Sequence, residues 1–67
     1  MNRKPIASSR ILSVGWGNNT LEVQFKGGNV YQYFGVVEAE YKMLINSASP
    51  GKAITQIQKT HNYRPVI

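Results

Sequence analysis

The chain has 67 residues and a net charge of +5, from eight Lys and Arg against three Glu, and it contains no Cys. This length suits one domain, and the missing Cys excludes disulfides, thiolate nucleophiles and thiolate metal ligands. No long apolar run follows the charged start, so we expect neither a signal peptide nor a membrane span. The composition predicts a small cytoplasmic domain.

The positive charge has two interpretations. It favours anionic partners such as nucleic acid, but small domains also carry a net charge of about 2 to 8 for solubility alone. The basic residues are scattered rather than gathered in a tail. A domain of this size buries little surface and has no covalent staple, so we also expect a homo-oligomer.

Alternation of apolar and polar residues predicts three strands, over residues 11–16, 21–26 and 30–34. Gly- and Asn-rich turns separate them. Residues 1–9 show no periodicity and are expected to form a mobile lead-in. The strands form an antiparallel meander, with one core face made by Leu12, Val14, Trp16, Leu21, Val23 and Phe25.

In this register Trp16 lies opposite Leu21, and Leu12 lies opposite Phe25. The pairing between them joins Val14 to Val23.

The pattern then changes to helical spacing. An apolar stripe predicts an amphipathic helix over residues 37–48, formed by Val37, Tyr41, Leu44, Ile45 and Ala48. Ser49 as N-cap and Pro50 at the first position start a short second helix, which ends near His61. The prediction is one α+β domain over residues 1–67 with the order β-β-β-α-α, in which the first helix crosses the sheet.

The face occupied by Tyr31 and Tyr33 depends on the length of the preceding loop. A two-residue Gly27-Gly28 turn places both rings on the outer face and Gln32 in the core. A three-residue loop over residues 27–29 places both rings in the core. The core placement is favoured because burying Gln32 is costly, whereas exposed tyrosines would offer a surface for base stacking.

The ordered residues resemble the KTSC domain, a small module found at the end of some lysyl-tRNA synthetases and as a stand-alone bacterial or phage protein. The resemblance is carried by Ser9-x-Ile11-x-x-Val14-Gly15-Trp16, Leu21-x-Val23-x-Phe25, Tyr31-x-Tyr33-x-Gly35-Val36, Tyr41-x-x-Leu44 and Ser49-x-Gly51-Lys52. It covers about residues 9–64 and implies RNA binding as the suggested role. The chain departs from the family in having Trp16 for Tyr, Val37 for Pro, and Ala53-Ile54 for an aromatic pair.

Catalysis and metal binding have little support in the sequence. The chain offers one His and three Glu, without a cluster that would supply general acid–base chemistry or three metal ligands. His61 is expected to be solvated, and Glu38 and Glu40 to be charges at a helix start. No catalytic residue, metal or cofactor is predicted.

Anion binding is predicted at the start of the second helix. Ser49, Gly51 and Lys52 would combine free backbone N–H groups with a positive charge, although an ordinary capped helix start fits the same residues. Further candidate ligand-binding residues are Lys59, Arg10, Arg64, Tyr31 and Tyr33, and Tyr63 is either another stacking ring or a residue packed at the tail.

Three functions follow as hypotheses. The first is a non-catalytic module that binds RNA or single-stranded nucleic acid. The second is a homo-oligomer that sequesters a small nucleotide of host immunity, as a phage protein in the host cytoplasm would. The third is a protein-interaction module that accepts a partner strand at a sheet edge.

Overall fold

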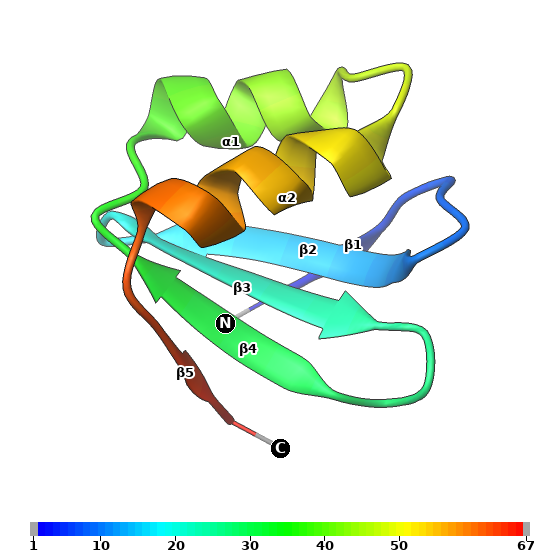
Figure 1. Ribbon diagram of the computed structural model, residues 1–67, viewed down its shortest axis with the longest axis horizontal. Helices are drawn as coiled ribbons and strands as arrows, with labels where there is room; N and C mark the ends of the chain where they lie inside the picture. Colours follow the sequence, from blue (N-terminus) through cyan, green and yellow to red (C-terminus); the bar gives the residue numbers. More distant parts are fainter. Residues whose placement is uncertain (1, 67) are drawn as a thin grey trace.

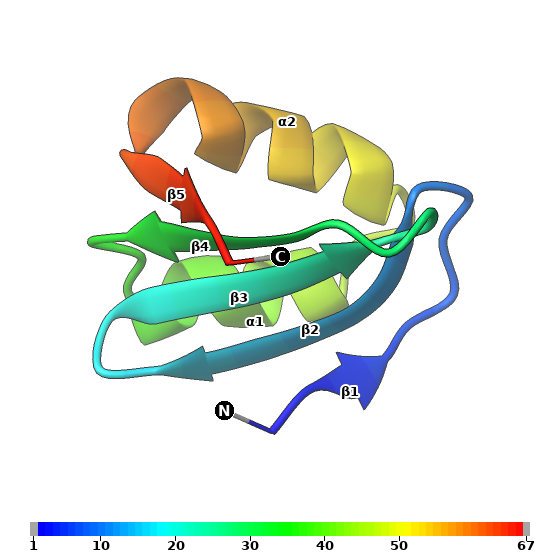
Figure 2. The same cartoon turned by 90° about the horizontal axis from the view of Figure 1, so that it is seen from below.

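The computed structural model describes residues 2–66. One antiparallel sheet of five strands, in the order β1-β2-β3-β4-β5, carries both helices on one face (Figures 1 and 2). The other face has no helix on it (Figure 2). The elements are β1 (Lys4–Pro5), β2 (Ile11–Gly17), β3 (Thr20–Phe25), β4 (Val30–Phe34), α1 (Glu38–Ile45), α2 (Pro50–Thr60) and β5 (Tyr63–Pro65).

The α+β class and the central β-β-β-α-α order are confirmed. Two edge strands extend the predicted meander: β1 pairs with β2 inside the expected lead-in, and β5 pairs with β4. Both have two or three residues and contain a proline, so neither shows the alternation by which strands are recognised. Neither helix within residues 2–66 has the length and apolar character that crossing a bilayer requires.

The register of β2 and β3 is confirmed at Trp16 opposite Leu21 and at Val14 opposite Val23. It is wrong at Leu12, because a bulge between Ile11 and Ser13 pairs Ile11 with Phe25. The extra residue in β2 exchanges the inward and outward sides of the strand before Ser13. Ile11 is therefore fully buried, while Leu12 is 46% exposed.

The core lies between the sheet and the two helices. Leu44 of α1 and Ile54 and Ile57 of α2 pack against the buried residues of β2 to β4. Trp16 joins α1 to the sheet: its indole stacks on the Tyr41 ring at 6.2 Å and its Nε1–H donates to the Val36 carbonyl at 2.7 Å.

The apolar stripe predicted over residues 37–48 is only partly buried. Val37 is 49% exposed, and Ala48 lies beyond the end of α1. Val37 stands as the N-cap of α1, where its backbone N–H donates to the Glu40 carboxylate at 3.2 Å. Glu40 thus acts at the helix start as predicted.

The hairpin between β3 and β4 decides where the tyrosines lie. The Phe25 N–H donates to the Asn29 carbonyl at 2.8 Å, so the loop is Lys26 to Gly28, with positive φ of 107° at Gly27 and 100° at Gly28. Tyr33 lies opposite Leu21 on the core face and is 1% exposed. The core placement is confirmed. The loop length is not, because a two-residue loop would shift the pairing of β3 with β4 by one residue and the loop over residues 27–29 by two.

Candidate functional site

A cleft of about 550 Å³ opens where the segment before β2 meets the start of α2. We call it the α2 cleft. Its lining joins residues more than 40 positions apart in the sequence: Ala7, Ser8, Ser9, Arg10, Ala48, Ser49, Pro50, Gly51, Lys52, Thr55 and Gln56. Its volume lies within the range of about 300 to 1,000 Å³ typical of ligand pockets.

Arg10 is held across this cleft by α2. Its Nη1 donates to the Gly51 carbonyl and to the Thr55 hydroxyl, each at 2.8 Å. Within residues 2–66, the Arg10 side chain makes these hydrogen bonds through Nη1 alone, so Nε and Nη2 remain available to a ligand. A guanidinium fixed in this way presents a preorganised fork of donors, which suits phosphate oxygens.

Gly51 makes this arrangement possible. A Cβ at position 51 would lie 3.2 Å from the Arg10 Cδ, closer than side chains normally approach. The absence of a side chain therefore lets the arginine lie against the first turn of α2.

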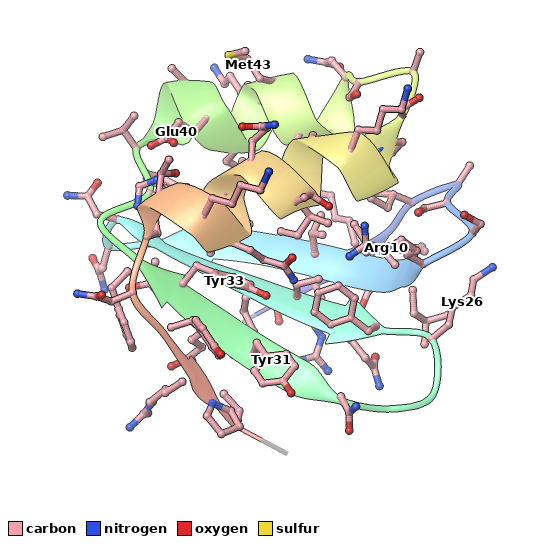
Figure 3. The ribbon with its side chains drawn as sticks, viewed as in Figure 1. Arg10, Lys26, Tyr31, Tyr33, Glu40 and Met43 are labelled. Atoms are coloured by element: carbon pink, nitrogen blue, oxygen red, sulfur yellow. The ribbon has the colours of Figure 1, made fainter. Side chains whose placement is uncertain are left out.

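The cleft is electrostatically one-sided. Its described lining contains two cations, Arg10 and Lys52, and no carboxylate. Lys26 is anchored beside Arg10, because its backbone N–H donates to the Arg10 carbonyl at 2.9 Å. Figure 3 shows Arg10 and Lys26 at the same end of the molecule, and Glu40 at the opposite end.

Two of the acidic residues are engaged elsewhere. Glu22 lies on the helix-free face, where Arg3 pairs with it and the Gln32 amide donates to it at 2.9 Å. Burial raises the pKa of Glu22, but the hydrogen bonds from Gln32 and Arg3 and the Arg3 charge outweigh it and leave the pKa lowered.

Glu40 pairs with His61. The His61 Nε2 lies 2.8 Å from a Glu40 oxygen, and Nδ1 lies 2.9 Å from the Phe34 carbonyl. The expectation of a solvated His61 is wrong, since its ring is 14% exposed and joins β4 to α1. The hydrogen bond with His61 lowers the pKa of Glu40 and outweighs the opposing effect of burial.

The structure brings together four of the predicted site residues: Arg10, Ser49, Gly51 and Lys52. Ser49 holds the N-cap position but its side chain makes no capping hydrogen bond. Lys59 lies in the last turn of α2, away from the cleft. Arg64 pairs with Gln32 in the sheet, so its side chain belongs to the helix-free face.

A second cavity, of about 340 Å³, lies beside the other end of α2 and is lined by Tyr31, Tyr33, Gln58 and Tyr63. We call it the tyrosine pocket. The Tyr63 ring is 5.7 Å from both the Tyr31 ring and the Tyr33 ring, and Tyr63 is 58% exposed. Tyr31 is half-buried, so Tyr31 and Tyr63 can offer ring surface to a ligand, whereas buried Tyr33 cannot.

Burial raises the pKa of Tyr33, and the hydrogen bond from Gln58 and the charge of Arg10 oppose that increase. Figure 3 shows Arg10, Tyr31 and Tyr33 below α2, on its side away from α1.

Sequence reasoning missed Thr55 and Gln58. Both follow from the buried stripe of α2, since Ile54 and Ile57 face the sheet and their C-terminal neighbours flank that stripe. Among residues 2–66, no three side chains of His, Asp or Glu gather closely enough to share a metal ion.

These features define a small basic α+β domain with an open cationic cleft at the start of α2 and an aromatic pocket near its other end. The sequence profile of the KTSC domain matches residues 7–63, and the chain belongs to that family. The crystal structure of the KTSC domain protein YPO2434 from Yersinia pestis is similar to it, with a TM-score of 0.90 and 36% sequence identity over 98% of this chain and 97% of that one. No protein of curated function shows significant similarity to the chain.

Proposed function

We propose that this domain is a non-catalytic cytoplasmic module that binds single-stranded nucleic acid, RNA in the first place, along the side of α2 that carries Arg10. The observation that carries the proposal is the α2 cleft, whose described lining has two cations and no carboxylate and whose guanidinium is held in place by α2. Anchored cations neutralise phosphates without losing the entropy of a free side chain.

The aromatic surface of the tyrosine pocket adds a second reason. Exposed Tyr63 and half-buried Tyr31 line a pocket near the other end of α2, and bases stack on such rings with little regard to sequence. A single strand that lies along α2 would meet a phosphate site near one end of the helix and stacking rings near the other. Tyr33 takes no part as a stacking ring because it is buried.

The strand-addition hypothesis fits the fold less well. Each edge strand contains a proline, Pro5 in β1 and Pro65 in β5, which cannot donate to an added strand. The nucleotide-sequestering hypothesis requires several copies, whereas the α2 cleft is formed within one chain. Native mass spectrometry separates the two nucleotide-binding forms, because the sequestering form predicts an oligomer that carries a small nucleotide.

The test compares two charge reversals that change net charge equally. Lys52→Glu alters the cleft, and Lys42→Glu alters an exposed lysine of α1. Fluorescence anisotropy with a single-stranded RNA is measured for each variant over a range of salt concentrations. Loss of one phosphate contact lowers the slope of log affinity against log salt by about 0.7.

We expect this change for Lys52→Glu only. Equal effects of the two reversals would point to net charge rather than to a site. Absent or salt-independent binding by the unaltered protein would overturn the proposal.

A further inference from the structure

The tyrosine pocket contains two hydrogen-bonded side chains, Gln58 and Tyr33, that each keep an unused hydrogen-bonding group. The Gln58 Nε2 donates to the Tyr33 hydroxyl at 3.1 Å, and both residues line the pocket. A phenol can donate as well as accept, and among residues 2–66 the Tyr33 O–H has no acceptor. The structure therefore leaves a donor on a side chain that is 1% exposed.

Gln58 has unused capacity of the opposite kind. Its hydrogen bond to Tyr33 uses one amide N–H, and the carbonyl oxygen has no donor among the described residues. A donor and an acceptor thus stand next to each other. An adjacent donor and acceptor are also what the Watson–Crick edge of each nucleobase presents.

The rings give the pocket the shape of a site for a flat ligand. Tyr31 and Tyr63 meet at an interplanar angle of 84°, with their centroids 5.7 Å apart. A planar ring that stacks on Tyr63 would therefore meet Tyr31 edge-on, and both contacts are favourable between aromatic groups. An aliphatic ligand has no planar ring that could use both contacts.

We infer that the tyrosine pocket is a base-recognition subsite, in which one nucleobase stacks on Tyr63 and its hydrogen-bonding edge meets Tyr33 and Gln58. This inference rests on the proposed function, because the phosphates of the same strand are assigned to the α2 cleft. The same chemistry would accept a base within RNA or a base of a free nucleotide.

The experiment uses variants that remove single polar groups and keep the shape. Tyr33→Phe and Gln58→Leu alter the pocket, while Tyr41→Phe on α1 and Gln24→Leu in β3 are matched controls away from it. Each folded protein is titrated by anisotropy with ten-residue homopolymers of U, A and C, and with an abasic ribose-phosphate chain of equal length. Calorimetry with UMP and AMP covers the free nucleotides.

We expect the unaltered protein to bind the preferred base-bearing chain at least about tenfold more tightly than the abasic chain, as one stacked base predicts. Tyr33→Phe and Gln58→Leu should each reduce the preference among homopolymers by about five- to tenfold, and leave binding to the abasic chain unchanged. The two controls should match the unaltered protein.

The subsite is overturned if the abasic chain binds as well as the others, or if the pocket variants weaken all chains equally or not at all. Those results leave the proposed function standing, because phosphate binding persists. If no chain binds while UMP or AMP binds and the pocket variants abolish it, the subsite stands and the proposed function falls. Binding of neither class overturns both.

Discussion

Arg10, immediately before β2, donates from one guanidinium nitrogen to the Gly51 carbonyl in the first turn of α2, at 2.8 Å. This contact joins segments 41 residues apart and orients the arginine across the α2 cleft. The remaining guanidinium donors keep their capacity for a phosphate. The proposed activity depends on this contact more than on net charge.

Gly51→Ala should separate binding from stability. The added Cβ displaces the arginine, which we expect to weaken RNA binding by about fivefold, as loss of a hydrogen bond of about 1 kcal/mol would. Alanine favours helix by up to about 1 kcal/mol, so the free energy of unfolding should be unchanged or higher. Gly17→Ala, where a Cβ meets open space, is the control. Anisotropy and urea unfolding check both values, and unchanged RNA affinity in Gly51→Ala would contradict this role.

Ile11→Ala and Leu12→Ala test the bulge in β2. Truncation of fully buried Ile11 should lower the free energy of unfolding by about 2 to 5 kcal/mol. Truncation of Leu12, which is 46% exposed, should change it by about 0.5 kcal/mol or less. Urea denaturation measures both, and a larger loss at Leu12 than at Ile11 would show that the bulge is misplaced.

Stability should fall in acid because of Glu22 and Glu40. Folding lowers both pKa values below the ordinary 4.5, so the unfolded chain binds more protons between the two values. Their contribution is therefore fully present above about pH 4.5 and is lost as the pH falls through the folded values. Urea midpoints between pH 7 and pH 2 should show this decline, and Glu40→Gln should make it shallower. A flat profile down to pH 3 would contradict the ion pairs.

The sequence predicts the central fold because its signals are local. Alternation marks β2, β3 and β4, and the Ser49-Pro50 pair marks the start of α2. The bulge at Ile11 cannot be predicted in this way. Ile11 and Leu12 are both apolar, so the alternation alone does not show which of them faces the core. The edge strand β5 is defined by its pairing with β4 rather than by its own residues.

The candidate site was partly predictable. The Ser49 to Lys52 segment follows from helix-start chemistry, and the structure places Arg10 beside it. The tyrosine pocket depends on the placement of Tyr63 by β5, which only the folded chain reveals. Lys59 shares the helical spacing of Lys52 but lies two turns further along α2, and the charge of Arg64 does not reveal that its strand pairs at the edge of the sheet.

The most direct test is to map RNA binding on the protein by NMR. A ¹⁵N-labelled sample is titrated with a single-stranded RNA, and amide chemical shifts are followed residue by residue. We predict that the shifts concentrate at Arg10, Gly51, Thr55 and Tyr63, which border the two cavities. Shifts confined to the helix-free face, around Glu22 and Gln32, or no shifts at saturating RNA, would contradict binding along α2.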